Sequence, residues 1–165
     1  MTFKNFRNLI PFAWLIIAIL LIDQVTKLLV MDFLGVEGNS LKLLPIFNLT
    51  LVFNPGVSFG MLVSLGKWGP YILTALSVTM VVFLLAWLKN TVVCIERIAL
   101  SIIIGGAIGN IIDRLRLGKV VDFIDFYINN HHWPAFNFAD AMICIGVFLL
   151  LWSQLSTHRS EKNSA

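Results

Sequence analysis

Residues 9–31 read LIPFAWLIIAILLIDQVTKLLVM, an apolar run with one acidic and one basic residue. A helix needs about 20 residues to cross the hydrocarbon layer of a bilayer, so this run is long enough to span it. Three further blocks of similar length and character lie at residues 68–88, 95–112 and 138–155. The sequence therefore predicts an all-α membrane protein with four transmembrane helices, forming one integral-membrane domain over residues 1–165.

The composition of the 165-residue chain agrees with lipid as its surroundings. Hydrophobic residues make up 58% of it, charged residues only 13%, and the mean hydropathy is +0.87, beyond the usual range of a soluble domain. Basic residues are spread singly and form no run that would follow a phosphate backbone, so nucleic-acid binding is not expected. Cys94 and Cys144 lie in apolar blocks, which predicts small buried side chains and not a disulfide or a metal site.

The first block resembles a secretory signal because Lys4 and Arg7 precede it. It is long, however, carries Asp23 and Lys27 and lacks a small-residue cleavage site, so we expect a permanent helix. An even number of spans places both termini on one side, and the basic N-terminus predicts that this side is cytoplasmic. The polar tail, residues 157–165, is expected to be disordered there.

Two segments, residues 32–67 and 114–137, would lie on the outer, periplasmic side. Residues 47–53 read FNLTLVF, an alternating stretch rich in β-branched and aromatic residues, and the turn sequence Asn54-Pro55-Gly56 follows. This predicts a small β-sheet between the first two helices, at the membrane interface because hydrocarbon does not tolerate open sheet edges. The second segment is expected to be an aromatic loop at the headgroup level, whose residues 123–133 could close over a bound peptide.

Polar residues stand in the predicted helices, where each charge costs about 2.5 to 3.5 kcal/mol and marks either a function or a buried pair. Asp23 and Lys27 are one helical turn apart and share a face, which fits a structural ion pair and a direct role equally well. In the third block the small residues 105–109 suit close helix packing. Packing does not explain the three polar residues that follow them: Asn110, Asp113 and Arg114.

Acidic residues near the last helix are candidates for catalysis. Asp122 and Asp125 lie among branched and aromatic residues, and either alone could belong to a solvated loop. Asn137 is a predicted N-cap, which places Asp140 where a capping box carries its acid. Asp122 and Asp140 together could work as general base and general acid, because apolar surroundings and a like charge would raise the pKa of one of them. Spacing alone does not choose between Asp122 and Asp125.

Other catalytic arrangements have little support in the sequence. It contains neither a Gly-x-Ser-x-Gly elbow nor a His-Glu-x-x-His motif. His131 and His132 are adjacent and would point apart, which makes them a poor chelating pair. No metal and no cofactor is expected.

Five motifs stand in order along most of the chain: DQVTK at residues 23–27, NPGVSFG at 54–60, GGAIGNIIDR at 105–114, VVDFIDF at 120–126 and FNFAD at 136–140. They resemble the signature blocks of bacterial lipoprotein signal peptidase, also called signal peptidase II. One such block would be a weak signal, whereas five in order within four predicted helices are specific. The one departure is mild: Val57 precedes Ser58 where the family usually carries two small residues.

The resemblance implies an aspartic endopeptidase of the bacterial inner membrane, which removes the signal peptide of a prolipoprotein by cutting before its diacylglyceryl-modified cysteine. The active site would lie near the periplasmic face, with Asp122 and Asp140 as the catalytic pair and with Asp113 and Asp125 in structural roles. Further residues would line or order the site: Asn54, Asn110, Arg114, Asn137 and Asp23. The implied partners are diacylglyceryl-modified prolipoproteins and membrane lipid, and a monomer is expected.

Two other classes of protein could carry buried charges. A small ion- or proton-coupled transporter would use them as a relay, but such proteins tend to show internal repeats and broken helices near the midplane. Neither feature is visible, and the polar residues stand near the outer end of each block. A noncatalytic scaffold would leave the carboxylates among aromatic residues unexplained. The peptidase is therefore the favoured interpretation.

Overall fold

The computed structural model describes residues 9–56 and 68–162, with residues 157–162 as backbone alone. Four long helices dominate it, and each is long and apolar enough to cross a membrane. Their bounds are α2 Ile10–Leu34, α3 Gly69–Asn90, α4 Cys94–Leu117 and α5 Phe138–Lys162. The prediction of four transmembrane helices is confirmed. The basic residues Lys4 and Arg7 lie outside the described residues, as do residues 57–60 of the second motif and residues 163–165 of the tail.

All four helices end later than predicted, α4 and α5 by the largest margins. Helix α4 continues past Ile112 to Leu117, because the residue that can end it is Gly118, whose φ of 69° is the left-handed conformation of a helix C-cap. The Gly118 N–H donates to the carbonyl of Arg114 at 3.0 Å, so Arg114 belongs to the last turn of the helix. Helix α5 continues to Lys162, over part of the tail that was expected to be disordered.

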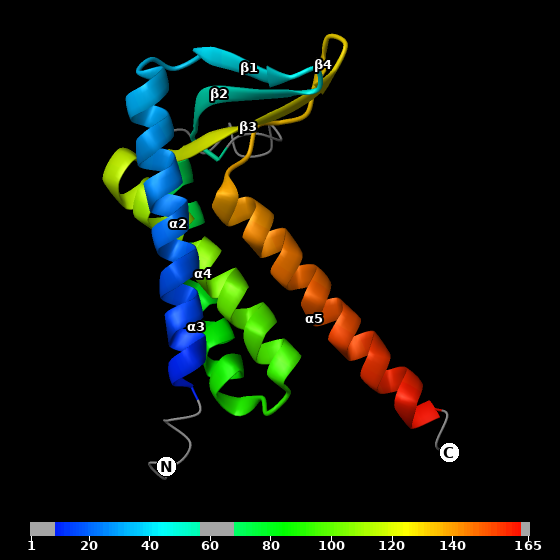
Figure 1. Cartoon of the computed structure of the whole chain (residues 1–165). Coiled ribbons are helices and arrows are strands. Elements are labelled where there is room, and N and C mark those ends of the chain that lie inside the picture. The colour runs from blue at the N-terminus through cyan, green and yellow to red at the C-terminus, as the bar shows by residue number, and fades with distance from the viewer. Residues whose placement is uncertain (1–8, 57–67, 163–165) are drawn as a thin grey trace.

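Helix α4 is the central helix and packs against the other three (Figure 1). Small residues allow the close approach that the sequence predicted. A Cβ at Gly106 would lie 2.6 Å from the carbonyl oxygen of Ala139 in α5, and one at Gly109 would collide with the carboxylate of Asp23 in α2. These glycines bring α2 and α5 against the same stretch of α4.

A four-stranded antiparallel sheet lies at one end of the helices, which we call the sheet end (Figure 1). Its strands follow the order β1 (Ser40–Leu44), β2 (Phe47–Asn54), β3 (Val120–Ile128) and β4 (His131–His132). The first two confirm the sheet predicted between the first two helices. The second segment was wrongly expected to be an aromatic loop, since it supplies β3 and β4.

The strand was not predicted because side chains on both faces of β3 are buried. Its sequence therefore lacks the alternation of apolar and polar residues that marks a strand with one buried face. Val121 and Phe123 pack on Val30 of α2 and Leu51 of β2. Phe123 is therefore a core residue, and the proposed closing of residues 123–133 over a peptide is wrong at this position.

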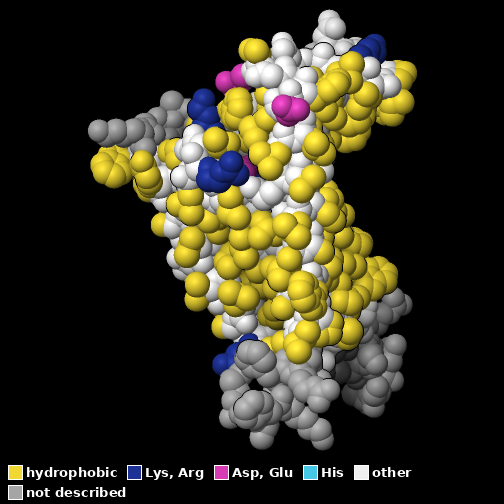
Figure 2. Space-filling view, turned by 60° about the vertical axis from the view of Figure 1, so that its left-hand side comes forward, with side chains coloured by type: hydrophobic (Ala, Val, Ile, Leu, Met, Phe, Trp, Pro, Cys, Tyr) yellow, Lys and Arg dark blue, Asp and Glu magenta, His cyan; other side chains and the backbone are white. Residues whose placement is uncertain are grey.

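The start of α2 and the end of α5 both lie at the end opposite the sheet (Figure 1). Hydrophobic side chains cover the helices between the two ends, and the charged side chains in view gather near the ends (Figure 2). This is the surface expected of helices in lipid. Cys94 and Cys144 are exposed on it, so the prediction that they are buried is wrong: each occupies an outward face of its helix.

Candidate active site

Two carboxylates from separate elements approach each other at the sheet end of the helices. Asp122 belongs to β3 and is 1% exposed, while Asp140 belongs to the first turn of α5 and is half-buried. Antiparallel pairing sets Asp122 opposite Val52 of β2, so that Asn54, at the end of the same strand, lies beside it. The sheet and the last helix therefore position one acid each.

Side-chain amides connect these two carboxylates. Asn137 Nδ2 donates to Asp122 Oδ1 at 2.7 Å and to Asn110 Oδ1 at 3.2 Å. Asn110 Nδ2 in turn donates to Asp140 Oδ1 at 2.8 Å. On the other side of Asp122, Asn54 Nδ2 donates to Oδ2 at 2.9 Å. Three predicted site residues thus contact a member of the acidic pair directly.

The predicted capping box at the start of α5 is present. The Asp140 N–H donates to Asn137 Oδ1 at 3.0 Å, and the Asn137 N–H donates to Asp140 Oδ2 at 3.3 Å. The box satisfies two backbone donors that the helix itself leaves open. The box also holds Asp140 and Asn137 in a fixed relative position. Because Asn137 donates to Asp122, the same contacts that cap the helix help to place Asp140 relative to Asp122.

The environment of Asp122 is unusual for a carboxylate. Burial raises its pKa to about 6, and the negative charge of Asp140 acts in the same direction. The hydrogen bonds from Asn54 and Asn137 oppose this change because they stabilise the ionised form. Asp122 therefore titrates near neutral pH, where it can exchange a proton.

Arg114 completes the cluster from the last turn of α4. Its charge is attracted to Asp140, Asp113 and Asp122. Its Nη1 lies 3.5 Å from the carbonyl oxygen of Asn110, and its buried Nε has no hydrogen-bond partner among the residues that the structure describes. An arginine carries five N–H donors, so this guanidinium retains donors for a bound group.

Asp23 lies behind the acidic pair. Its Oδ2 forms an ion pair with Lys27 Nζ at 2.9 Å, and its Oδ1 accepts the backbone N–H of Ala139 at 3.0 Å. No described hydrogen bond joins Asp23 to Asp122 or Asp140. Of the two roles that the sequence left open for Asp23 and Lys27, the structure shows the buried ion pair.

Asp125 belongs to the same strand as Asp122 but to a different cluster. It accepts hydrogen bonds from Asn48 Nδ2 at 3.1 Å and Thr50 Oγ1 at 3.0 Å, and His132 Nδ1 lies 2.8 Å from its Oδ1. Its burial acts to raise the pKa of Asp125, but the hydrogen bonds from these three residues outweigh burial and lower it. Asp125 is thus held as a structural carboxylate within the sheet.

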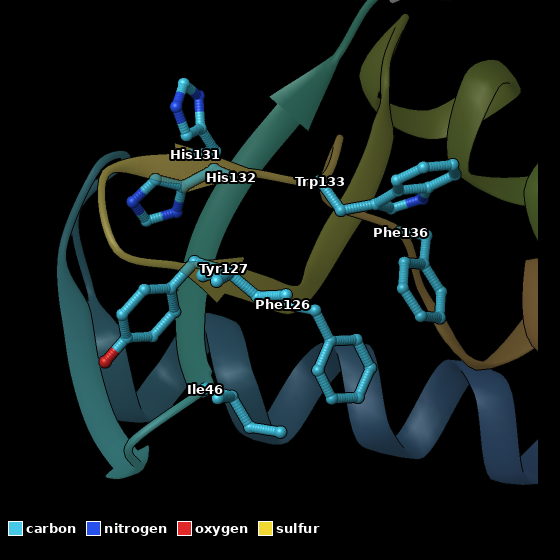
Figure 3. Close-up of a pocket in the computed structure, with 8 residues that line it drawn as sticks. Ile46, Phe126, Tyr127, His131, His132, Trp133 and Phe136 are labelled. Atoms are coloured by element: carbon cyan, nitrogen blue, oxygen red, sulfur yellow. The ribbon is translucent and has the colours of Figure 1, made fainter.

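Two hollows open near the sheet. A cavity of about 350 Å³ borders Asp122 and is lined by Val52, Phe53, Asn54, Pro55, Asp122, Pro134 and Ala135. A larger one of about 600 Å³ lies further along the sheet, where Phe126 and Phe136 stack with centroids 6.1 Å apart (Figure 3). Aromatic and aliphatic side chains and two histidines line it, and none of its described lining residues carries a carboxylate, whereas Asp122 borders the smaller cavity.

Some contributions were not predicted from the sequence. Pro134 and Ala135 border the cavity beside Asp122 although neither carries a reactive group. Gln24 Nε2 donates to Asp23 Oδ2 and to Asp113 Oδ1, both at 3.1 Å, and so joins α2 to α4. The role of Gln24 could have been suspected from the sequence, because an uncharged polar residue inside an apolar helix is unusual. Within the described ranges, no group of His, Cys, Asp or Glu side chains could hold a metal ion.

Comparison with known proteins decides the family. The family model described as signal peptidase (SPase) II matches residues 15–156. The chain belongs to the signal peptidase II family. A lipoprotein signal peptidase from Coxiella burnetii (strain Dugway 5J108-111) is 41% identical over 163 residues, which cover 98% of this chain and 99% of that protein. One from Alteromonas mediterranea is 40% identical over 98% of this chain and 91% of its own.

Solved structures agree with this membership. A bacterial membrane enzyme solved at 1.9 Å resolution superposes with a TM-score of 0.77 at 30% identity, covering 88% of this chain and 92% of that one. A second, at 2.3 Å resolution, has the same TM-score at 28% identity, covering 88% of both chains. The resemblance to the signal peptidase II family is confirmed, and the chain is accordingly a multi-pass membrane protein and a peptidase.

Proposed function

We propose that this peptidase is of the aspartic type, with Asp122 and Asp140 as its catalytic pair. The observation that carries the proposal is the amide-bridged pair itself: two carboxylates from different elements, one of them fully buried with a pKa of about 6. Burial and a neighbouring like charge raise the pKa of one of two adjacent carboxyls, so that it keeps its proton at a pH where an ordinary carboxyl is ionised. One can then act as base while the other acts as acid.

The reaction follows from these protonation states. The ionised carboxylate takes a proton from a water molecule, whose oxygen attacks the carbonyl carbon of the scissile bond. The protonated carboxyl donates its proton to the carbonyl oxygen, which gives a tetrahedral intermediate with two hydroxyl groups. As this intermediate collapses and the C–N bond breaks, the carboxyl that took the water proton passes it to the leaving nitrogen, and the other carboxylate takes back a hydroxyl proton. Arg114 has free donors beside the pair and can hold a substrate oxygen, which fixed donors in a dry site do effectively.

The proposed substrates are prolipoproteins, in keeping with the names of the relatives. The proposed position of the cut, just before a diacylglyceryl-modified cysteine, is the one that the resemblance of the five motifs implies. A substrate with two acyl chains is already dissolved in the bilayer. It can reach a site at the end of the helices sideways through the lipid, without entering from water. A monomer would suffice for this, since one chain supplies both carboxylates.

We further propose the bacterial inner membrane as the location, with both termini in the cytoplasm and the sheet end toward the periplasm. The basic residues before the first helix favour this orientation, since positive charge is retained on the cytoplasmic side. Signal peptides are removed on the far side of the membrane, where the sheet end would then lie.

The test is cleavage of a synthetic prolipoprotein peptide by the purified chain in detergent, with products identified by mass spectrometry. The matched control is the same peptide with an unmodified cysteine. We expect one cut before the modified cysteine, little cleavage of the control, and about 10³-fold slower cleavage by Asp140→Asn. If Asp140→Asn cleaved the peptide at the wild-type rate, the assignment of Asp122 and Asp140 as the catalytic pair would be refuted. If both peptides were cleaved equally fast, the proposed preference for a diacylglyceryl-modified cysteine would be refuted.

A further inference from the structure

Lys27 is the most deeply buried cation among the described residues, with 1% of its side chain exposed. Its ammonium group has three N–H donors and three acceptors around it. Nζ lies 2.9 Å from Asp23 Oδ2, 2.8 Å from Asp113 Oδ2 and 2.9 Å from Asn110 Oδ1. Because the group is enclosed by α2 and α4, it does not touch a bound substrate.

Two of these acceptors, the carboxylates of Asp113 and Asp23, also accept a backbone N–H from a residue next to the acidic pair. Asp113 Oδ2 also accepts the N–H of Val121, the residue before Asp122, at 3.2 Å. Asp23 uses its other oxygen, Oδ1, to accept the N–H of Ala139, the residue before Asp140, at 3.0 Å. The ion pairs of Lys27 are thus linked both to the strand and to the helix that carry the two carboxylates.

The third acceptor acts on the pair directly. An ammonium group only donates, so Asn110 must turn its Oδ1 toward Lys27. Its Nδ2 is then left to donate to Asp140 Oδ1, as observed at 2.8 Å. With the amide reversed, an oxygen would face the carboxylate of Asp140 and repel it. Lys27 thereby sets the polarity of this hydrogen bond.

From these three connections we propose that Lys27 is a positioning residue for the peptidase, which fixes the separation of Asp122 and Asp140 without contacting the substrate. The proposal rests on the proposed function of the acidic pair. Displacing a catalytic group by about 1 Å can slow a reaction by about 10²-fold. Loss of Lys27 therefore lowers kcat and leaves KM nearly unchanged.

Glu96 offers a matched control at the other end of α4. It is a buried charged residue, 8% exposed, that likewise connects separate elements, accepting from Gln154 of α5 at 2.7 Å and from Thr91. None of its described hydrogen bonds leads to the acidic pair. Glu96→Met and Lys27→Met each replace a buried charge by the same unbranched apolar side chain, and thermal unfolding measures how far each substitution disturbs the fold.

The experiment measures kcat and KM on the diacylglyceryl-modified peptide, together with thermal unfolding in detergent. For Lys27→Met we expect kcat to fall about 10²-fold with KM within about twofold, and for Glu96→Met we expect both constants within about twofold. The limb of the pH profile that reports the ionisation of Asp122 also moves to higher pH in Lys27→Met alone, because the charge of Lys27 stabilises ionised Asp122. A variant that merely loosened the helices would not move this limb.

Two results would overturn the proposal: a folded Lys27→Met with wild-type kcat, or equal losses of kcat in both variants. If Lys27→Met does not fold, Asp113→Asn decides, since it keeps the shape of the side chain and, by removing the charge of Asp113, weakens the connection that runs from Lys27 to Val121. A kcat loss of about 10-fold at constant KM then supports the proposal, and wild-type kcat refutes it. If the wild-type protein cleaves the peptide and Asp140→Asn does not, the proposed function is supported whatever the result for Lys27→Met. If the folded wild-type protein does not cleave the peptide, both the proposed function and the role of Lys27 are refuted.

Discussion

Strand β3 carries two carboxylates with opposite surroundings. Asp122 and Asp125 are three residues apart, an odd spacing that directs side chains to opposite faces of a strand. Asp122 faces the first turn of α5 and lies among asparagine amides. Asp125 faces the polar side chains of β2 and an imidazole from β4. Both belong to the same nine-residue strand and hence to the same local backbone.

Burial alone does not separate these two residues. Asp122 is 1% exposed and Asp125 is 6% exposed, yet the pKa of Asp122 is raised to about 6 while that of Asp125 is lowered. Burial acts to raise the pKa of both carboxyls, and the hydrogen bonds around each oppose it. For Asp122, burial and the like charge of Asp140 outweigh the hydrogen bonds from Asn54 and Asn137, whereas the three hydrogen-bond partners of Asp125 outweigh its burial. One strand therefore holds a carboxyl suited to proton transfer beside one suited to structure.

The largest expected effect is on activity. Asp122→Asn removes the group that exchanges protons, so we expect cleavage of the diacylglyceryl-modified peptide to slow by about 10³-fold. Asp125→Asn keeps the shape of the side chain and leaves the acidic pair intact, so its kcat/KM should stay within about threefold of wild type. Both are measured on the purified chain in detergent. A reversed outcome would make Asp125 the catalytic residue.

A smaller effect is expected from the two asparagines of β2 that donate to these carboxylates. Asn54 stabilises ionised Asp122, so Asn54→Leu raises the pKa of Asp122 further. If the ionised form is the base, activity is lost as pH falls, and the acid limb of kcat/KM near pH 6 moves to higher pH. At pH 6 we expect about a 10-fold loss, partly recovered at higher pH.

Asn48→Leu is the matched control, because Asn48 donates to Asp125 in the same way from the same strand. Its acid limb should coincide with that of wild type. The limb reports the pair as a whole, since interacting carboxyls titrate together. An equal displacement in both variants would mean that the limb follows the stability of the sheet and not the ionisation of Asp122.

The helices and the capping box were predictable because their signals are local. Four apolar blocks of the right length give the four spans. Asn137 and Asp140 are three residues apart, which is the spacing of a capping box, and they form one. In the same way, Asp23 and Lys27 share a face of one helix and form the expected ion pair.

Strand β3 and the choice of carboxylate were not predictable from local patterns. Asp122 and Asp125 break the alternation of a strand because each is buried on a different face. Which of them meets Asp140 depends on the pairing of β3 with β2 and on the path of α5, and these relations join residues far apart in sequence. Likewise, the meeting of Lys27 with Asn110 and Asp113 depends on the close approach of α2 and α4 at Gly109.

The smallest expected effect is on stability, where the two carboxyls should respond to pH with opposite sign. The folded pKa of Asp125 is lowered, so its ionised form contributes stability above the usual value of 3.8, and this is lost as pH falls through the folded value. His132 is 53% exposed, which limits the contribution to about 1 kcal/mol or less. Asp125→Asn should lower the unfolding midpoint by about 2 to 4 °C at pH 7 and by less below pH ~4.

Asp122→Asn provides the opposite case in the same unfolding measurement. A carboxyl whose folded pKa is raised from 3.8 to about 6 favours the folded state while it is protonated, and that contribution is lost as pH rises through about 6. The midpoint of Asp122→Asn should therefore rise relative to wild type between pH ~4 and ~6, the window bounded by the two pKa values. Because the two substitutions are chemically identical and lie on one strand, their opposite trends would isolate the surroundings of each carboxyl as the cause. Parallel trends would mean that the faces of β3 do not differ electrostatically, and the assignment of Asp122 as the proton-exchanging residue would lose its physical basis.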